Sequence, residues 1–544
     1  MGFVVLEILL IQTMIKLVIL LSFIIHFAYT LWTLKKALHI LQLNSYRNSR
    51  YLRWVHKNYS RIIRPTDFLP GVALPLLLFE LSMIASLVWI ASYLFLFLTR
   101  CDSPEKKKFV WTSRVQRLFV ATVVLLVVLS AVAFYTLWYA NTVFVSFTVF
   151  AALMLLSVFS VSLVLIGNLL IAPLEQAINR WYYHDAKRLV KEMPNLAVIG
   201  ITGSFGKTST KYILSKILSE QFNVLMTPES YNTPMGITKV IRTSLKPIHD
   251  IFIAEMGAKQ KGDIKELCHL VSPRLGILTA IGEQHLETFK SLETIKRTKN
   301  ELVESLPDNG IAFLNWDNEH IRALPQPAQV KTIHYGINSA GLDYAAENLQ
   351  LTSEGQTFTV CQPDGSRFVL QTKLLGQYNI YNILAAVACA CELGVDREII
   401  SYVVKNLVPI PHRLELKRSL NNVTIIDDAF NSNPMGAKMA LAVLKNLVGQ
   451  QKILVTPGMV ELGAKEYELN KAFGIDAAAV CDYIILVGQK QTAPIQEGLQ
   501  SQHYAGEKYY IAKDFSDAMQ HLQTVAQAGD VVLFENDLPD TYNE

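Results

Sequence analysis

The chain has 544 residues, of which 51% are hydrophobic and only 18% are charged, and its mean hydropathy is +0.27. Soluble domains average about a quarter charged residues, so this composition argues against an ordinary cytosolic enzyme. It also excludes an intrinsically disordered chain, which needs low hydrophobicity and high charge. The formal net charge of +4 is uneven, with +10 on residues 1–173 and −6 on the remainder. A basic apolar part is joined to an acidic globular part, and the latter argues against nucleic acid as a partner.

Four uncharged apolar stretches precede residue 174 and predict a transmembrane region of about four helices over residues 1–173. The stretches are 17–34, 81–99, 118–140 and 142–174. Each has about 18 residues or more, enough to cross a hydrocarbon core of about 30 Å. No basic segment precedes the first stretch, so a cleaved signal peptide is not expected. We expect a multi-pass protein of the plasma membrane, with basic side chains held by anionic lipid.

The path through the membrane has two alternatives. Basic residues cluster in segments 35–67 and 100–117, and the positive-inside rule places both in the cytoplasm. A single crossing between the two segments would put them on opposite sides. Either the stretch that begins near Pro75 and Glu80 is re-entrant, or one basic segment breaks the rule. The turn at 139–142 would then lie outside, and the helix ending near Pro173 would return to the cytoplasm.

The six cysteines predict neither a disulfide framework nor a zinc site. They stand at positions 101, 268, 361, 389, 391 and 481, and no pair has CxxC spacing. Such cysteines are typical of reduced thiols that pack as small hydrophobic side chains. We expect them in the cores of a cytosolic domain.

A candidate phosphate-binding loop follows a linker helix that we expect over 174–196. A short β-rich run at 198–201 leads into the glycine-containing loop Thr202–Ser209, and a helical stretch follows at 210–221. In this order of strand, loop and helix, backbone N–H groups of the loop face phosphates and the helix N-terminus adds positive potential. The sequence therefore predicts ATP as a ligand.

The residue types of this loop suit individual tasks at a nucleotide. Lys207 is expected to reach the β- and γ-phosphates, and Thr208 to hold Mg²⁺. The spacing departs from the strict phosphate-loop pattern, because Gly200 precedes Gly206 by one residue too many. The predicted nucleotide-binding residues of the loop are Gly203, Ser204, Gly206, Lys207, Thr208 and Ser209.

This GxxGKT pattern after a strand resembles the Mur ligase family of ATP-dependent amide-forming enzymes. Further motifs similar to those of the family follow in order along residues 197 to about 490, and are most similar to those of the ligases that add D-alanyl-D-alanine. These motifs are 230–236, 253–258, 284–287, 291–300, 375–382, 411–413, 427–434 and 459–463.

The resemblance implies a role for one or two residues in most of these motifs. Glu255 would bind magnesium, His285 would bind a second metal ion, and Lys299 would be carbamylated, so that two Mg²⁺ ions are expected. Lys207, Lys299 and His285 would be the catalytic residues. The nucleotide would further contact Asn232, Asn379, Asn382, Arg413 and Asp428. The usual histidine before the first asparagine of the 375–382 motif is Tyr378 here.

The resemblance also implies the fold and the reaction. A central α/β ATP-binding domain is expected over 197–410 and a smaller α/β C-terminal domain over 411–544, both with mostly parallel sheets. The segment 408–413 would be the hinge on which the last domain closes. A carboxylate would attack the γ-phosphate to give an acyl phosphate, and an amine would displace phosphate to leave an amide, ADP and Pi.

The sequence departs from the family at the parts that contact other substrates. Membrane helices occupy the place of the N-terminal domain that holds the UDP-sugar. Residues 533–539 stand where the family has Lys-Gly-Ser-Arg, so Glu535 and Asp537 replace basic residues, and Asn470 replaces a histidine. The resemblance implies carboxylate and amine substrates from cell-wall peptide synthesis, either UDP-linked or lipid-linked.

Two other functions remain open alongside a cell-wall ligase. The first is a polymer-forming amide ligase similar to the poly-γ-glutamate synthases. The second is an ATP-driven transporter, which would need ionisable groups inside its spans. Lys16 and Glu80 lie only near the edges of the apolar stretches, which argues against transport.

Overall fold

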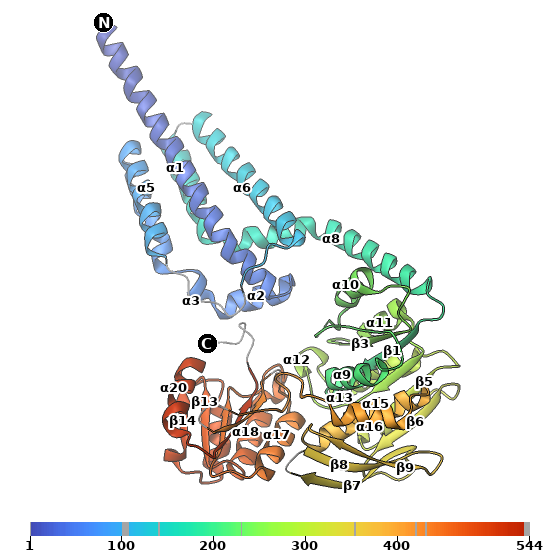
Figure 1. Ribbon diagram of the computed structural model, residues 1–544. Coiled ribbons are helices and arrows are strands. Elements are labelled where there is room, and N and C mark those ends of the chain that lie inside the picture. The colour runs from blue at the N-terminus through green and yellow to red at the C-terminus, as the bar shows by residue number, and fades with distance from the viewer. Residues whose placement is uncertain are drawn as a thin grey trace. The chain divides into compact units, whose positions relative to one another are not determined.

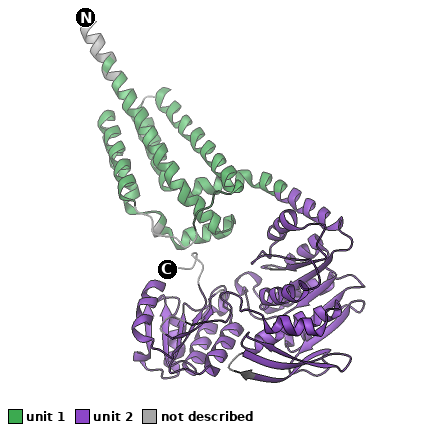
Figure 2. Cartoon of the chain, in the orientation of Figure 1, with its two compact units in different colours: residues 1–178, 539–543 green, residues 179–538, 544 purple. Residues whose placement is uncertain are grey.

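The computed structural model describes residues 2–100, 108–139, 142–229, 231–352, 355–418, 422–429 and 432–537. It divides into two compact units, unit 1 over residues 1–178 and unit 2 over residues 179–538 (Figure 2). Several residues named in the sequence motifs lie outside the described residues. They are Cys101, residues 102–107 of the second basic segment, Ala140 and Asn141 of the expected outer turn, Ser230, Phe430, Asn431, Leu538 and Pro539.

Unit 1 is helical. Its elements are α1 (Gly2–Leu43), α2 (Asn48–Lys57), α3 (Tyr59–Ile62), η1 (Pro65–Ala73), α4 (Leu74–Leu78), α5 (Ser82–Thr99), α6 (Ser113–Tyr139), α7 (Val143–Val158) and α8 (Ser160–Lys191), the last of which continues into unit 2. Within the described residues, four helical segments are long and apolar enough to cross a membrane, namely Thr13–Leu43, α5, α6 and α8. The segment Pro65–Leu78 and helix α7 are apolar but shorter.

Helices α1 and α5 run parallel, because the contacts between them advance along both helices together (Figure 1). Ser22 Oγ donates to the carbonyl of Ser86 over 3.4 Å, and ten residues later the ring of Trp32 packs on that of Phe97. Residues 65–81 therefore lead the chain back along the bundle before α5 begins. Arg100, just after α5, pairs with Asp67 of η1 at 3.2 Å, so the segment 65–99 begins and ends at the same end of the bundle.

The beginning of α6 lies at this same end of the bundle. The guanidinium of Arg114 lies 4.1 Å above the ring of Tyr46, which follows α1. Helix α6 then runs antiparallel to α1 and brings Trp138 to Lys16. The basic segments 35–67 and 100–117 therefore share one end of unit 1 in their described parts. Of the two alternatives left by the sequence, a re-entrant path of residues 65–99 is the one that would place both basic segments at one end in this way.

The predicted apolar stretch 142–174 is wrong as a single helix. Helix α7 ends at Val158 and α8 begins at Ser160, because Phe159 leaves helical geometry. Just after the break, the carbonyl of Val161 accepts a hydrogen bond over 3.1 Å from the hydroxyl of Tyr51 on α2. Helix α8 passes through Pro173 without ending, so the expected linker helix is the second half of α8.

Unit 2 contains a nine-stranded sheet with the order β2-β3-β1-β4-β5-β6-β7-β8-β9. Neighbouring strands are parallel from β2 to β7, and only β7, β8 and β9 are antiparallel. The strands are β1 (Ala197–Thr202), β2 (Val224–Met226), β3 (Ile251–Glu255), β4 (Leu275–Leu278), β5 (Ile311–Asn315), β6 (Lys331–Gly336), β7 (Tyr344–Thr352), β8 (Gly355–Cys361) and β9 (Arg367–Thr372). The meander at β7–β9 was not predicted.

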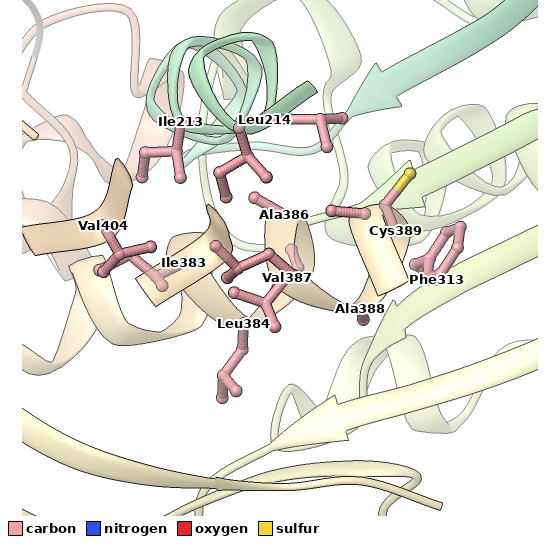
Figure 3. Close-up of a cluster of buried hydrophobic side chains, with 14 of the residues drawn as sticks. Ile213, Leu214, Phe313, Ile383, Leu384, Ala386, Val387, Ala388, Cys389 and Val404 are labelled. Carbon is pink, nitrogen blue, oxygen red and sulfur yellow. The ribbon is translucent and has the colours of Figure 1, made fainter. Parts of the chain in front are cut away.

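Helices cover both faces of this sheet, because its parallel strands are apolar on both sides. One face packs on α9 (Lys207–Leu218), α15 (Gln377–Glu392) and α16 (Arg397–Lys405). The other packs on α10 (Pro234–Ser244), α11 (Asp263–Val271), α13 (Leu292–Glu304) and the end of α8. Two short helices, α12 (Leu286–Phe289) and α14 (Glu319–Arg322), follow β4 and β5. Figure 3 shows Ile213 and Leu214 of α9 directed at the alanine-rich middle of α15.

A six-stranded sheet follows, with the order β10-β11-β15-β12-β13-β14 and only the pair β10–β11 antiparallel. Its strands are β10 (Glu415–Arg418), β11 (Thr424–Asp428), β12 (Lys452–Thr456), β13 (Tyr483–Val487), β14 (Tyr509–Ala512) and β15 (Val531–Glu535). Its helices are α17 (Pro434–Asn446), α18 (Glu466–Ala478), α19 (Ala493–Ser501) and α20 (Phe515–Val525), with short 3₁₀ turns η2 (Gly463–Lys465) and η3 (Gly506–Lys508). The prediction of an α/β fold with mostly parallel sheets is confirmed for unit 2.

The sheets place polar residues at the carboxyl ends of their parallel strands. In open α/β sheets, ligands bind outside these ends where neighbouring strands lead to opposite faces. Strand β1 lies between β3 and β4, and its end leads directly into the glycine-containing loop. Cys268, Cys389 and Cys481 are buried in hydrophobic cores away from this edge, and the five cysteines among the described residues are free.

Candidate active site

The glycine-containing loop joins β1 to α9 and holds Lys207 against its own backbone. The Nζ of Lys207 donates to the carbonyls of Gly203, over 2.6 Å, and Ser204, over 3.1 Å. Burial lowers the pKa of Lys207 to about 8, against the nearby carboxylate of Glu255, which raises it. Helix α9 begins at Lys207, three residues earlier than predicted, so its first N–H groups face the same space as the lysine.

Two neighbours outside the loop fix its shape. The hydroxyl of Thr279, just after β4, donates to the carbonyl of Phe205 over 2.5 Å. The side-chain oxygen of Asn382, on α15, accepts from the hydroxyl of Thr210 over 3.2 Å. Asn382 was predicted at the nucleotide, whereas Thr279 was missed, because a lone threonine after a strand carries no motif.

Glu255 ends β3 beside the loop in a buried ion pair. Its Oε2 lies 2.9 Å from Nζ of Lys211, and the two side chains are only 1% and 2% exposed. Its Oε1 accepts from the Asn232 amide over 3.1 Å. Burial acts to raise the pKa of Glu255, but Lys211 and Lys207 outweigh it and hold the pKa below its usual value. Lys211 was missed; its only signal is its position one helical turn after Lys207.

Lys299 lies on α13 and is 4% exposed. Within the described residues no ion pair within 4.0 Å includes Lys299, although the carboxylates of Asp263, Glu301 and Glu255 act from farther away to raise its pKa. Burial holds its pKa well below the usual value, and the charge of Lys207 lowers it further. A lowered pKa makes the neutral amine, which is the form that adds carbon dioxide, more accessible.

His285 follows β4 and faces the six-stranded part of unit 2. Its Nδ1 lies 2.5 Å from Oε2 of Glu461, which belongs to the loop after β12. Burial lowers the pKa of His285, against Glu461, which raises it. The motif around 459–463 was recognised in the sequence, but no role was predicted for Glu461.

Arg413 and Asp428 reach the loop from the beginning of the six-stranded part. The guanidinium of Arg413 donates to the hydroxyl of Thr208 over 3.4 Å. Asp428 accepts from the backbone N–H of Leu414 over 3.1 Å. The predicted hinge segment 408–413 has no regular secondary structure and lies between α16 and β10. The two sheets of unit 2 therefore meet at the phosphate loop.

Asn379 lies one helical turn before Asn382 on α15. Its Oδ1 accepts from the Asn382 amide over 3.4 Å, and its own amide donates to the carbonyl of Leu375 over 2.8 Å. Tyr378, which replaces the family's usual histidine, packs on Phe205 with 5.1 Å between ring centroids. This replacement therefore covers the loop with an aromatic ring.

Two acidic residues, Glu535 and Asp428, lie opposite each other at the ends of the neighbouring strands β15 and β11. Glu535, at the end of β15, is 1% exposed, and its Oε1 accepts from the hydroxyl of Ser432 over 2.6 Å. Burial raises the pKa of both Glu535 and Asp428. The charge of Asp428 raises the pKa of Glu535 further, whereas the hydrogen bond with Glu535 acts to lower the pKa of Asp428. Asn470, the second departure, is also buried and binds the loop after β12 through the Met459 backbone.

The structure thus brings the predicted residues into one region of unit 2. They are Gly203, Ser204, Gly206, Lys207, Thr208, Ser209, Asn232, Glu255, His285, Lys299, Asn379, Asn382, Arg413 and Asp428, which belong to the ends of β1, β3 and β4, to the loop between β2 and α10, to α9, α13 and α15, and to the segment around β10 and β11. No group of three His, Cys, Asp or Glu side chains that could hold a metal ion exists within the described residues. Any metal ion here would have few protein ligands and keep several oxygen ligands of other origin, as Mg²⁺ does.

This fold is that of the Mur ligases. Residues 201–390 match the Mur ligase middle domain, and residues 412–535 match the Mur ligase glutamate ligase domain. The chain belongs to the Mur ligase family. It is therefore an ADP-forming enzyme that joins carbon to nitrogen, and the predicted enzyme class is confirmed.

Curated relatives and solved structures point to one branch of the family. The chain is 32% identical to the UDP-N-acetylmuramoyl-tripeptide--D-alanyl-D-alanine ligase of Escherichia coli (strain K12) over 326 residues, which are 60% of this chain and 72% of the relative. It is 30% identical to the enzyme of the same name from Bacillus subtilis (strain 168) over 352 residues, 64% of this chain and 75% of that one.

Among solved structures, MurF from Thermotoga maritima in complex with ADP has a TM-score of 0.60 and 25% identity, and covers 67% of this chain and 81% of its own. MurF from Acinetobacter baumannii has a TM-score of 0.59 and 25% identity, and the match covers 67% of this chain and 78% of that one. The likeness lies in the part of the chain that carries the site, since the matched domains begin at residue 201.

Replacing Gly206 with alanine should weaken nucleotide binding at least tenfold. Gly206 has φ +84°, and a Cβ there would lie 2.6 Å from Oδ1 of Asn382, so the loop would have to move. The matched control is Gly394→Ala, where φ is +80° but no atom lies within 4 Å of the added Cβ. Both variants carry the backbone cost of about 1–2 kcal/mol, but only the first disturbs the loop. Calorimetric titration with ADP measures the difference; equal affinities of the two variants would contradict this account.

Proposed function

We propose that the chain is a MurF-like ATP-dependent ligase of peptidoglycan precursor synthesis that works through an acyl phosphate. The observation that carries the proposal is the convergence of Lys207, Thr208 and Arg413 on one loop end beside Glu255. Lys207 and Arg413 come from different sheets of unit 2, and both are buried cations. A triphosphate supplies the negative charge that this arrangement lacks.

ATP binding is proposed for the chain's own residues as follows. The backbone N–H groups of Gly203–Ser209 and the N-terminus of α9 would bind the phosphates. Lys207 would leave the loop carbonyls for the β- and γ-phosphates, and Asn379 and Asn382 would contact the nucleotide from α15. Arg413 and Asp428 would complete the site from the second sheet.

Magnesium fits the donor set. The hydroxyl of Thr208, the carboxylate of Glu255 and the imidazole of His285 are hard or intermediate donors, and a carbamate on Lys299 would add oxygens. Lys299 suits this modification because it is buried without a carboxylate partner. When bound, Mg²⁺ would neutralise charge on the phosphate oxygens.

The proposed reaction has two steps. A substrate carboxylate oxygen attacks the γ-phosphorus, the bond to the bridging oxygen breaks, and ADP leaves. The substrate amine then attacks the acyl carbon, loses a proton, and expels phosphate, which carries away the carboxylate oxygen. Lys207 and Arg413 hold the γ-phosphate oxygens while two anions approach each other, which is the electrostatic difficulty of the first step.

The substrates proposed are a muramoyl peptide carboxylate and a dipeptide amine, by analogy with the names of the relatives. Glu535 stands where the family has basic residues, so the amine half of the site differs from the family pattern. A lipid-linked acyl donor, rather than a UDP-linked one, is compatible with the membrane anchor proposed below for unit 1.

Unit 1 is proposed as a multi-pass anchor in the plasma membrane. Three helices of unit 1 are long and apolar enough to cross, and the fourth such helix, α8, leads from unit 1 into unit 2. The re-entrant path lets both basic segments lie on the cytoplasmic face with anionic lipid. On α8, Glu175 pairs with Arg117 at 2.5 Å, which puts this part of the helix at the basic end before unit 2 begins. In this proposal the transmembrane region covers residues 1–173 and the linker helix 174–196. The central ATP-binding domain covers 197–410 and the C-terminal domain 411–544.

Purified full-length protein in detergent tests the reaction directly. With ATP, Mg²⁺, UDP-muramoyl tripeptide and D-alanyl-D-alanine, we expect phosphate release that requires both substrates and a product heavier by the dipeptide less water. Phosphate release with glutamate alone and a growing polymer would support the poly-γ-glutamate alternative. Hydrolysis that needs neither substrate would contradict a ligase.

Lys299→Ala should lower this activity by at least a hundredfold, because the proposed carbamate oxygens are lost. Added formate or acetate should restore part of the activity by occupying the vacated space. The control is Lys296→Ala, on the same helix α13 but three residues earlier. Full activity of Lys299→Ala would remove the carbamate from the proposal.

Cysteine labelling in cells tests the membrane path. In a background without native cysteines, Lys57→Cys and Lys108→Cys should react with a membrane-impermeant maleimide only after permeabilisation, because both basic segments lie inside. Tyr139→Cys, at the exposed end of α6, should react in intact cells. Reaction of Lys57→Cys and Lys108→Cys from opposite sides would show that residues 65–99 cross the membrane.

A further inference from the structure

Glu461 connects the second sheet of unit 2 to the proposed metal ligand of the first. Its Oε2 lies 2.5 Å from Nδ1 of His285, across 176 positions of sequence. The backbone carbonyl of Glu461 also accepts from the N–H of Glu287 over 3.3 Å. Both the side chain and the main chain of Glu461 are therefore directed at the turn that carries His285.

The backbone at this contact is held in an uncommon conformation on both sides. His285 has φ +53° and Glu461 has φ +64°, although neither is glycine. Such residues persist where the surrounding structure determines them, and they concentrate at functional sites. Gly463 approaches so closely that a Cβ there would lie 3.2 Å from the backbone of Glu287. The loop and the turn are therefore fitted to each other at the backbone level.

The contact decides which nitrogen of His285 is available. A carboxylate accepts a proton, so the neutral imidazole carries its hydrogen on Nδ1 and donates it to Glu461. The lone pair is then on Nε2, for which the structure has no hydrogen-bond partner in the part of the chain that it describes. A carboxylate–histidine pair of this kind orients a histidine ligand and increases its basicity toward a metal ion.

We propose that Glu461 is a positioning residue that presents His285 to a divalent cation only when the two sheets of unit 2 are closed on each other. The inference rests on the proposed function, in which His285 is a metal ligand. Closure would then raise the affinity for the cation, and by linkage the cation would favour closure by the same factor. Neither the family motif nor the relatives' names assign this role to Glu461.

The alternative is that Glu461 only holds the two halves of unit 2 together and does not position His285. The structure offers a matched control that separates these two roles. Lys465, four residues after Glu461, pairs with Glu283 at 2.6 Å, two residues before His285. This ion pair joins the same loop to the same turn but does not touch the imidazole. Lys465→Ala therefore removes a similar contact without changing how His285 is held.

The test uses full-length protein in detergent with a non-hydrolysable ATP analogue, and Mn²⁺ as the probe. Electron paramagnetic resonance measures free Mn²⁺ and hence affinity, and electron spin echo modulation detects a directly bound ¹⁴N. We expect Glu461→Ala to weaken Mn²⁺ binding about 10- to 100-fold and to diminish the ¹⁴N signal. Glu461→Gln should fall between Glu461→Ala and the unmodified protein, and Lys465→Ala should change the affinity less than twofold.

The double variant Glu461→Ala with His285→Ala should bind Mn²⁺ as tightly as His285→Ala alone. Glu461 acts only through His285, so its loss has no further effect once the imidazole ligand is gone. Unchanged affinity and ¹⁴N signal in both Glu461→Ala and Glu461→Gln, with a loss in His285→Ala, would overturn this inference and leave the proposed function standing. If His285→Ala itself has no effect on Mn²⁺, the metal assignment within the proposed function fails instead. Equal losses in Lys465→Ala and Glu461→Ala would also overturn the positioning role.

Discussion

Buried positive charge around the phosphate loop is the constraint on which the catalytic part of the molecule depends. Lys207, Lys211 and Lys299 lie within one region of unit 2, and Arg413 joins them from the second sheet. The Lys211 ammonium is directly paired with the carboxylate of Glu255, and the same carboxylate raises the pKa of Lys207 and of Arg413. Since buried charges are costly, so many cations around one loop favour an anionic ligand. Burial is the main cause of the lowered pKa values of Lys207 and Lys299, and a neighbouring cation lowers each further, Arg413 for Lys207 and Lys207 for Lys299.

The fold makes this concentration of charge possible by covering it from two sheets. The first sheet supplies the loop, Glu255 and the turn of His285 at the ends of three neighbouring strands. The second sheet supplies Arg413 and Glu461, which contact Thr208 and His285 respectively. Both groups of contacts would separate if the sheets moved apart at the segment 408–413. Nucleotide binding, cation binding and closure are therefore expected to depend on one another.

Much of the catalytic half could be predicted from sequence because its signals are local. The strand, loop and helix around Lys207 are contiguous, and Glu255 directly ends a strand. Lys211 could not be predicted, because its spacing from Lys207 says nothing about burial. Glu461 was also missed, since its contact joins segments far apart in the chain. In unit 1, the sequence showed the apolar stretches but not the break at Phe159, because no proline or glycine lies beside it to end a helix. The parallel packing of α5 on α1 could not be predicted either, because periodicity does not reveal packing direction.

A bound triphosphate would compensate the buried positive charge at the phosphate loop. Proton uptake on nucleotide binding tests this central claim most directly. A triphosphate beside Lys207 raises the lysine pKa from its value of about 8, so binding at pH 8 should take up about half a proton. Calorimetric titration of ATP in buffers of different ionisation enthalpy measures this number. The account predicts clear uptake at pH 8 that diminishes toward pH 6.5, where Lys207 is already charged, and its loss in Lys207→Met. Binding at pH 8 without proton uptake, or with the same uptake in Lys207→Met, would contradict it.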